Sequence, residues 1–360
     1  MRKLLVAFLI FIFFFIPSLA LANQEGTLEG KVVNILEEQE RETELGVQFY
    51  QKIEILITQG SIKDQKVEVE VGGNVSVVGQ PRYQVNDEVV VVQGEDYQGS
   101  KVFYIADFVR RDPLVFLFFL FVVSVITVAR WRGLTSLIGL GISFLIIFKF
   151  ILPMIYAGYD PVLITILASL AIIPVTFYLS HGFNQKTSIA IGGTLMALLI
   201  TGLLAKVFVE ASRLTGFASE EAGFLQVARG DLVNIRGLLL AGIIIGALGI
   251  LDDISIAQSA LVRQLRAANP KMRAKELFMR AMDVGQDHIA SMVNTLVLVY
   301  TGAALPLLLL FINNPLPFSQ VVNYEIIAEE IVRTLVGSIG LITAVPITTL
   351  LASSLDSKKR

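Results

Sequence analysis

The sequence predicts a membrane bundle of about seven transmembrane helices, preceded by a small exported all-β domain. Of the 360 residues, 54% are hydrophobic and 17% are charged, whereas about 25% of the residues of a typical soluble domain are charged. Mean hydropathy is +0.69. Long apolar runs begin at Pro113, while residues 23–112 are richer in charge and show strand-like alternation. Most of the chain must therefore lie in lipid.

The first 22 residues have the features of a secretory signal peptide. Arg2 and Lys3 precede an apolar run from Leu4 to Ile16, and Ala20-Leu21-Ala22 forms an A-x-A cleavage pattern. The run is short for a membrane span. We therefore expect cleavage after Ala22 and export of the following segment. An uncleaved N-terminal anchor is the alternative, and it would export the same segment.

Residues 23–112 are expected to form an extracytoplasmic β-rich domain. Lys66–Val71 alternates strictly between charged and apolar residues, which is the period of a half-buried strand. The predicted strands are Gly30–Leu36, Lys52–Ile57, Lys66–Val71, Glu88–Val92 and Val102–Ile105. Five short strands of this kind are typical of a small, OB-like barrel. Such a domain is either a packed platform or a ligand-binding module.

Seven apolar stretches follow, each close to the roughly 20 residues that a membrane helix needs. They are 113–129, 133–156, 161–180, 188–209, 237–262, 285–312 and 331–352. Together they define a transmembrane domain at 113–356, and a basic tail follows at 357–360.

Positive charge in the connecting segments indicates the orientation of these spans. Arg130 and Arg132 follow the first span, whereas segments 157–160 and 313–328 contain no Lys or Arg. We therefore expect a multi-pass protein of the bacterial cell membrane with an extracytoplasmic N-terminal domain and a cytoplasmic C-terminus. The lipid bilayer is the expected partner, and the formal net charge of −2 gives no indication of a nucleic-acid partner.

This topology gives spans two to four and spans five to seven opposite orientations, which is the layout of inverted repeats in secondary transporters. Ile138-Gly139-Leu140-Gly141 and Ile245-Gly246-Ala247-Leu248-Gly249 form a short sequence echo between the two halves. An inverted repeat is one interpretation. The other is coincidence, because glycine pairs are common in membrane helices.

Two adjacent aspartates in the fifth span are the strongest candidates for chemistry, because a charge at the bilayer centre costs at least about 2.5–3.5 kcal/mol. Asp253 lies ten residues before Arg263, so a helix places it about 15 Å from the cytoplasmic end. Asp252 and Ser255 share one face of that helix with Ser259. Because helix neighbours differ by about 100°, we expect one carboxylate to face a cavity and the other to meet a neighbouring helix.

A polar stripe begins the sixth span, where Asp287, Ser291 and Asn294 follow an i, i+4, i+7 pattern. Asn294 is expected at the depth of Asp253, and spans five and six are expected to be antiparallel neighbours that form a pocket open to the cytoplasm. The predicted ion- or proton-binding residues are Asp252, Asp253, Ser255, Gln258, Asp287, Ser291 and Asn294. These oxygen ligands suit a proton relay or a hard cation such as Mg²⁺ or Na⁺.

The alternative is that part of this set holds helices together. Serine and asparagine often bond across membrane helices, and Gly242 and Gly246 form a G-x-x-x-G contact face. We interpret Gly242, Gly246 and Gly249 as helix-packing residues. Packing is the favoured interpretation for the serines and the asparagine, and function for the aspartates, because packing seldom needs two charges.

The same sequence excludes most enzyme classes. The chain has no cysteine and two histidines, His181 and His288, so disulfides, thiolate sites and zinc-hydrolase clusters are not expected. The motifs H-E-x-x-H, G-x-S-x-G and G-x-x-x-x-G-K-[ST] are absent. Asp287 with Asp252 or Asp253 could supply the two carboxylates of an aspartyl intramembrane protease, but the G-x-G-D signature is missing. We predict that the protein is not an enzyme and needs no cofactor.

One part of the chain has recognisable motifs. They are Gly246-Ala247-Leu248-Gly249-Ile250-Leu251-Asp252-Asp253, then Asp287-His288-Ile289-Ala290-Ser291, and a run from Tyr300 through Gly302 and Pro306 to Phe311. These motifs resemble the YibE/F family of bacterial multi-span membrane proteins, whose plan of an exported β-rich segment and about seven spans is also similar. The resemblance implies a membrane protein with a role in transport, and it assigns no catalytic residue.

Two functions follow as hypotheses. The first is a secondary transporter or permease for a small ion or solute, with a proton- or cation-linked carboxylate site between spans five and six. The second is a non-transporting envelope scaffold or assembly factor that acts through the exported domain on a membrane or envelope protein partner. A minimal permease does not need such a domain, which is the reason to keep the second hypothesis.

Overall fold

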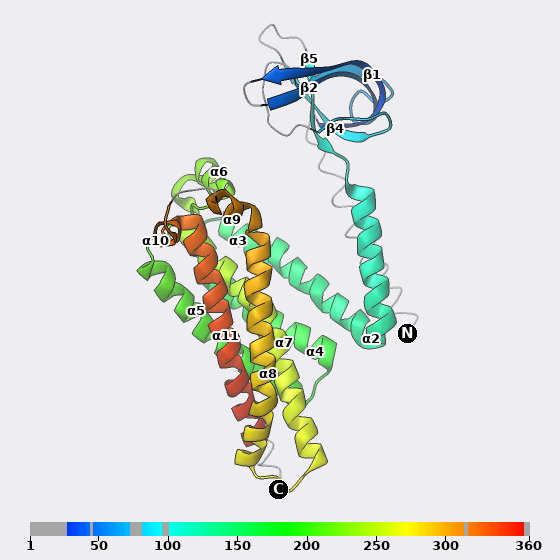
Figure 1. Ribbon diagram of the computed structural model, residues 1–360. Coiled ribbons are helices and arrows are strands. Elements are labelled where there is room, and N and C mark those ends of the chain that lie inside the picture. Colours follow the sequence, from blue (N-terminus) through cyan, green and yellow to red (C-terminus); the bar gives the residue numbers. More distant parts are fainter. Residues whose placement is uncertain (1–26, 44–45, 73–80, 96–100, 313–315, 356–360) are drawn as a thin grey trace. The chain divides into compact units, whose positions relative to one another are not determined.

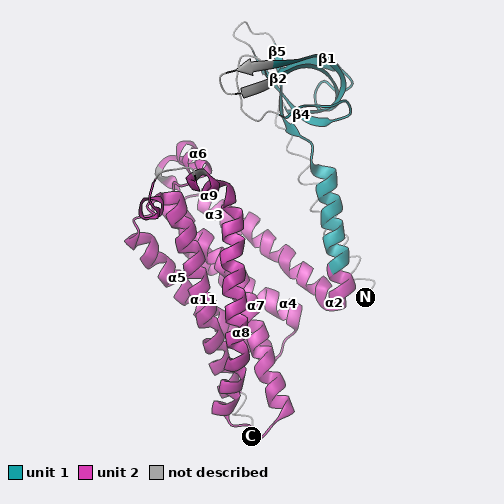
Figure 2. Ribbon diagram, viewed as in Figure 1, with its two compact units in different colours: residues 1–124 teal, residues 125–360 magenta. Residues whose placement is uncertain are grey.

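The computed structural model describes residues 27–43, 46–72, 81–95, 101–312 and 316–355. The chain divides into two compact units, residues 1–124 and 125–360 (Figure 2), and each is described by itself. The predicted signal peptide at 1–22 and the basic tail at 357–360 lie outside the described residues.

The first unit contains one antiparallel sheet with the strand order β3-β2-β1-β4-β5 (Figure 1). All five predicted strands are confirmed, as β1 (Thr27–Thr43), β2 (Gly46–Gln59), β3 (Lys66–Val71), β4 (Glu88–Glu95) and β5 (Lys101–Phe108). The alternation of β3 works as expected, because Val67 and Val69 are buried in the core while Glu68 and Glu70 are exposed. The edge strands β3 and β5 contact each other, but no backbone pairing joins them among the described residues, so the OB-like barrel stays a prediction.

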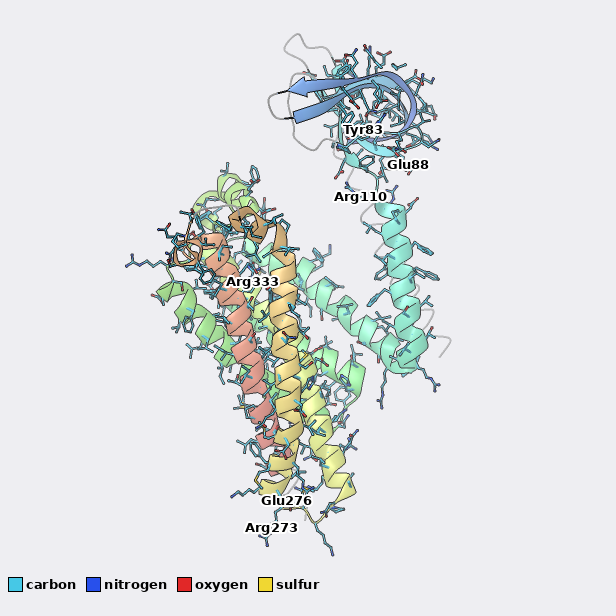
Figure 3. All side chains as sticks on the ribbon, viewed as in Figure 1. Tyr83, Glu88, Arg110, Arg273, Glu276 and Arg333 are labelled. Carbon is cyan, nitrogen blue, oxygen red and sulfur yellow. The ribbon has the colours of Figure 1, made fainter. Side chains whose placement is uncertain are left out.

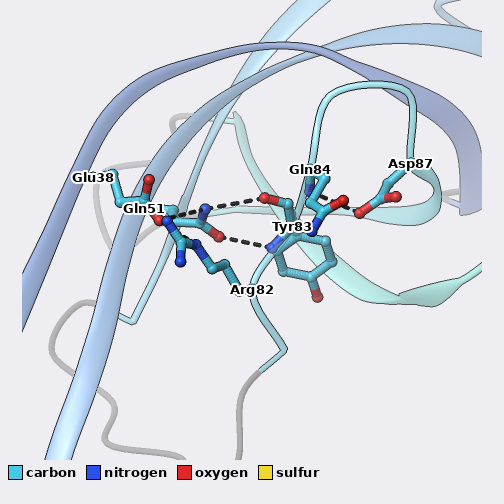
Figure 4. Close-up of polar contacts among 6 residues, drawn as sticks. All are labelled: Glu38, Gln51, Arg82, Tyr83, Gln84 and Asp87. Atoms are coloured by element: carbon cyan, nitrogen blue, oxygen red, sulfur yellow. Dashed lines mark hydrogen bonds and ion pairs between the residues drawn. The ribbon is translucent and has the colours of Figure 1, made fainter.

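A buried glutamine fixes the segment that enters β4. The Gln51 side chain, 1% exposed, accepts a hydrogen bond from the Tyr83 N–H (2.9 Å) and donates one to the Tyr83 carbonyl (3.1 Å), as Figure 4 shows. Gln84 N–H donates to the Asp87 carboxylate at 2.7 Å. Burial raises the pKa of the Tyr83 phenol. Together with the backbone hydrogen bonds that Asn86 and Asp87 form with Val32 of β1, these bonds hold an irregular stretch of backbone against the sheet.

The rest of the chain is helical. The helices are α2 (Arg111–Ile146), η2 (Ile147–Ile151), α3 (Leu152–Tyr156), α4 (Pro161–His181), α5 (Gln185–Ala211), α6 (Glu220–Arg229), η3 (Gly230–Leu232), α7 (Ile235–Ala268), α8 (Ala274–Ala303), α9 (Leu305–Ile312), α10 (Phe318–Val321) and α11 (Glu325–Leu355). Among the described residues, five stretches are long and apolar enough to cross a membrane, namely Arg111–Tyr156, α4, α5, α7 and α11. The chain therefore has the composition of a membrane protein.

The first of these stretches holds two of the predicted spans, 113–129 and 133–156, with a sharp turn between them. Arg130 has non-helical backbone angles, with a φ of 53°. A Cβ placed on Gly133 would lie 2.5 Å from the carbonyl oxygen of Val125, although residues eight apart in a straight helix are separated by about 12 Å. The chain therefore turns back at Arg130.

The predicted sixth span, 285–312, is not one continuous helix. It is divided at Ala304 between α8 and α9, and α8 is not among the five membrane-length apolar helices. The polar stripe from Asp287 to Asn294 lowers the hydropathy of α8 where a span would need apolar residues. The number of spans therefore stays a prediction.

In the helical unit, α5, α7 and α11 form the centre, and each packs against the other two. Buried side chains of these helices and of α4 make a common hydrophobic core. α4 packs on α5 and α7, and α8 packs chiefly on α11. Figure 3 shows Arg333 toward one end of this bundle and Arg273 and Glu276 at the other.

Candidate functional site

The two predicted aspartates lie in the middle of α7 and point to different sides, as their adjacent positions require. Asp252 is partly buried, and its Oδ1 atom is enclosed without a hydrogen-bond partner. Asp253 is exposed. This arrangement agrees with the expectation that the two adjacent carboxylates point into different surroundings.

The level of Asp253 can be given relative to the start of α5. Ser259 Oγ donates a hydrogen bond of 2.8 Å to the carbonyl of Lys186, the second residue of α5, so Ser259 marks the level where α5 begins. Asp253 is six residues before Ser259 in α7, a distance of about 9 Å. Beyond Ser259, α7 continues for nine residues to Ala268, and Val262 packs there with Leu277 of α8 and Ala352 of α11. The expected depth of Asp253 in a membrane stays a prediction.

Asp253 belongs to an open face of α7. Gly242, Gly246, Gly249 and Asp253 are spaced i, i+4, i+7 and i+11, and all four are exposed. A Cβ on Gly242 or Gly249 would meet no described atom within 4 Å, and one on Gly246 would meet only the Tyr300 hydroxyl, at 3.8 Å. Within the chain, this face therefore does not form the close helix packing expected of the three glycines.

The helices α7 and α8 contact each other at two levels, one on each side of Asp253 along α7. At one level Gly246 lies near Tyr300, and at the other Gln258 lies against Ala281 and Gly285. Asp253 lies seven residues from Gly246 and five from Gln258. In the antiparallel α8, the corresponding level falls close to Ser291, six residues from Gly285.

The predicted stripe occupies this level of α8 but not its packed side, since Asp287, Ser291 and Asn294 lie about 180–240° around the helix from the buried Gly285. Asp287, Ser291 and Asn294 are all exposed in the chain. Among the described residues, no hydrogen bond or ion pair is recorded for the side chains of Asp253, Asp287 or Asn294. The structure thus brings Asp253 and the stripe to one part of the bundle, with Ser291 rather than Asn294 at the level of Asp253, and it leaves their polar atoms unpaired.

Asp253 lies toward the end of the bundle where α4 ends and α5 begins. It is close enough to interact electrostatically with His181, the last residue of α4, and His181 in turn interacts with Arg132 and Lys186. Arg132 and Lys186 are on the side that the charge pattern assigns to the cytoplasm. His288, next to Asp287, is partly buried. The titratable group near Asp253 is therefore the His181 imidazole, which could exchange a proton with that side.

Two other predicted residues are enclosed in the bundle instead. Gln258, 2% exposed, donates hydrogen bonds of 2.8 Å to the Ala281 carbonyl and to Thr349 Oγ1. It therefore joins α7 to α8 and α11, which is the packing role considered as the alternative. Ser255 is fully buried, and its Oγ has no hydrogen-bond partner.

The closest helix contact is one that sequence reasoning missed, between α5 and α11. Thr348 Oγ1 lies directly on Gly193, and Thr201 Oγ1 lies directly on Gly340, so that a Cβ at either glycine would clash. The two contacts are reciprocal, because each helix gives one glycine and one threonine eight residues away. Both helices carry the pattern G-x-x-x-A-x-x-I-T, at 193–201 and at 340–348. A direct comparison of spans four and seven would have found it.

Comparison with known protein families agrees with this helical architecture. A family model described as YibE/F-like protein matches residues 117–358, which is more than half of the chain. The chain belongs to the YibE/F-like family. No curated protein and no solved structure matches it. The family match covers α4 to α11 and most of α2, whereas the five-stranded sheet lies outside it.

Proposed function

We propose that this YibE/F-like protein is a secondary transporter in which a hydrated cleft at Asp253, between the two contacts of α7 with α8, binds a proton or a small cation. The observation that carries the proposal is the position of Asp253. It is exposed at the level of the α8 stripe, between two helix contacts that bound the cleft. A transporter needs such a site, which both water and the coupling ion can reach.

The physical argument starts from the cost of an exposed carboxylate in hydrocarbon, which is at least about 2.5–3.5 kcal/mol. The carboxylates of Asp253 on α7 and Asp287 on α8 would each carry this cost in contact with lipid. We therefore expect water at both side chains. The described residues contain no group of three or more His, Cys, Asp or Glu that could hold a metal ion. The site therefore fits a proton or a partly hydrated Na⁺ better than a dehydrated divalent metal.

The reciprocal packing of α5 and α11 supports the same proposal. Secondary transporters are commonly built from repeats of opposite orientation that move against each other around a central site. The antiparallel helices α5 and α11 share the sequence pattern, and each has a second helix packed on it. This helix is α4 for α5 and α8 for α11. We infer an inverted repeat that includes α4–α5 and α8–α11, with α7 packed on both halves.

The proposed topology follows the charge pattern. Seven spans, with α2 counted twice across the turn at Arg130 and α8–α9 counted as the sixth, place the N-terminal sheet outside the bacterial cell membrane and the C-terminus in the cytoplasm. The cleft then opens to the cytoplasmic side, where Arg132 and Lys186 lie.

The test is ion flux in proteoliposomes. Purified protein is reconstituted with a pH-sensitive dye inside, and an outward Na⁺ or K⁺ gradient is applied. We expect cation-dependent proton movement that Asp253→Asn abolishes and Asp252→Asn reduces. Glu276→Gln is the matched control, because Glu276 is a partly exposed carboxylate in the first turn of α8, outside the cleft, and pairs with Arg280. Full flux in a folded Asp253→Asn, Asp252→Asn double variant would contradict the assignment.

The second candidate function, an envelope scaffold, is favoured by one observation: the sheet of residues 27–108 lies outside the region that matches the family. In that case the domain carries the cellular role by binding an envelope protein. A strain in which residues 27–108 are deleted would lose that role and the co-purifying partner, and the purified full chain would show no flux. If the deletion strain keeps the partner, the scaffold function does not reside in the sheet.

A further inference from the structure

We propose that a groove on the outer surface of α4, α5 and α7 binds one anionic phospholipid. The groove encloses about 780 Å³. Its walls are chiefly leucine and isoleucine side chains, among which Leu170, Leu199 and Leu203 are at least half exposed. This site is separate from the cleft between α7 and α8, and the proposal does not depend on the transport function.

The length of the groove matches one leaflet of a bilayer. Along α5 it runs from Lys206 to Leu195, and along α4 from Asp160 to Leu170. At about 1.5 Å per residue these stretches measure about 15–16 Å, which is half of the roughly 30 Å hydrocarbon core. An acyl chain that starts at the membrane surface would therefore end where the groove ends. A compact polar solute would leave the apolar walls without a partner.

One end of the groove is polar, and its charge suits a phosphate. The α5 residue Lys206 and the α7 residue Arg236 both line this end, both are exposed, and neither forms an ion pair within 4 Å among the described residues. The end also holds the Asp160 carboxylate, which accepts the Leu163 N–H (2.7 Å), and Asn234, whose Oδ1 accepts the Gly237 N–H (2.9 Å). Arg236 is also close enough to interact electrostatically with Glu325, whose carboxylate accepts hydrogen bonds from Thr215 and Gly216 and does not line the groove. Among the groove's lining residues, two cations and the Asp160 carboxylate leave a net positive charge for the headgroup.

The two cations lie at the same end because the helices are packed that way. Pro161, at the start of α4, lies against Gly237, at the start of α7. The last turns of α5, with Ala205 and Val209, share a hydrophobic cluster with Leu239 of α7. Long basic side chains at a membrane surface keep their charge in the headgroup layer while their stems cover apolar surface. A lipid phosphate would thus meet both cations at once.

The test is lipid retention by the full-length protein in native mass spectrometry. Protein in micelles is titrated with phosphatidylglycerol or with phosphatidylcholine of the same acyl chains. We expect phosphatidylglycerol to bind more tightly, by roughly 5-fold for each cation and roughly 25-fold for the pair. The Lys206→Gln, Arg236→Gln double variant should bind both lipids equally. Arg213→Gln, an exposed cation at the same end but outside the groove, should keep the preference.

A second variant tests the apolar part of the groove. A Cβ on Gly202 would only touch Ile244 at ordinary distances, 3.7–3.8 Å, so Gly202→Phe should fold and fill the groove, and it should lose both lipids. Equal binding of the two lipids by the native protein would overturn the proposal. So would an unchanged preference in the double variant, unchanged binding in Gly202→Phe, or displacement of the lipid by millimolar glycerol 3-phosphate, which would assign the site to a free phosphate compound.

Discussion

The contact between α5 and α11 and the contact between α7 and α8 show opposite ways of joining antiparallel helices. In the first, glycine on one helix receives threonine from the other at two levels, and all four residues belong to one repeated pattern. In the second, the helices touch near Gly246 and near Gln258, and the glycine face between these levels stays open. Small residues thus close one contact and leave the other open, so glycine content alone does not indicate where helices pack.

The two contacts differ in whether a solute can reach their polar side chains. At the closed contact, Thr201 and Thr348 are fully buried, and no solute can reach them without separating the helices. At the open contact, Asp253 and Ser291 are exposed on neighbouring helices. The proposed ion site therefore belongs to the open contact, while the closed contact holds α5 against α11.

The largest expected contrast is in cysteine labelling, which the chain suits because it contains no cysteine. In liposomes, Ser291→Cys and Asn294→Cys should react with a water-soluble maleimide, because the reagent needs a hydrated thiolate. Ser255→Cys, at a fully buried position, should react about 100-fold more slowly, if its exposure requires a local opening of about 3 kcal/mol. The reaction is followed by the mass of the labelled protein.

Val299→Cys separates exposure to water from exposure to lipid. Val299 is 60% exposed on the same helix but lies about 80° around it from Ser291, and in a bilayer its position should meet acyl chains and stay unlabelled. If Val299→Cys and Ser291→Cys react at the same rate, α8 does not present a hydrated stripe in a membrane.

The next effect is on stability, at the closed contact. Gly193→Ala and Gly340→Ala each place a methyl group on a threonine hydroxyl that has no room to move, and overpacking of this kind costs about 1–3 kcal/mol. Thermal unfolding in micelles should show both variants melting below the native protein. Restoring space with Gly193→Ala, Thr348→Ala should recover part of the loss, since alanine lacks the hydroxyl oxygen that the new methyl group meets. A native melting temperature for both single variants would show that the contact is not closed.

Much of the architecture was predictable from the sequence, because the patterns involved are local. Strict alternation gave Lys66–Val71 as a strand with its bounds unchanged. Unbroken apolar runs located α4, α5, α7 and α11, and a pair of arginines located the turn between the two parts of α2. Each of these features depends on residues adjacent in the chain, so neighbouring side chains are enough to read it.

The differences from the prediction have two kinds of cause. The single helix expected at 285–312 is divided at Ala304, a break that the apolar run does not reveal. Gln258, predicted to bind an ion, bridges α8 and α11 through Ala281 and Thr349, which are 23 and 91 residues away in the chain. A partner at such a distance cannot be inferred from the residue itself.

A smaller effect on stability is expected at Gln258, which joins α7 to α8 and α11. Gln258→Leu removes two buried hydrogen bonds, and interhelical bonds in membrane proteins average about 0.6 kcal/mol each. A loss of about 1 kcal/mol is therefore expected in an unfolding assay. Gln264→Leu, at an exposed position on the same helix, is the control. If both variants unfold alike, the bridge does not hold α7 against α8.

The smallest effect, and one of opposite sign, is expected on the open face. At Gly249 a methyl group meets nothing within 4 Å among the described residues, and alanine is a better helix former than glycine by up to about 1 kcal/mol. Gly249→Ala and Gly242→Ala should therefore unfold at or slightly above the native temperature, in contrast to Gly193→Ala. A clear destabilisation, of more than about 1 kcal/mol, would mean that the face is covered in the native protein. Since the G-x-x-x-G pattern of Gly242 and Gly246 is a known helix-pairing surface, the cover would then be a second copy of α7, and the destabilisation should decrease when the protein is diluted to the monomer.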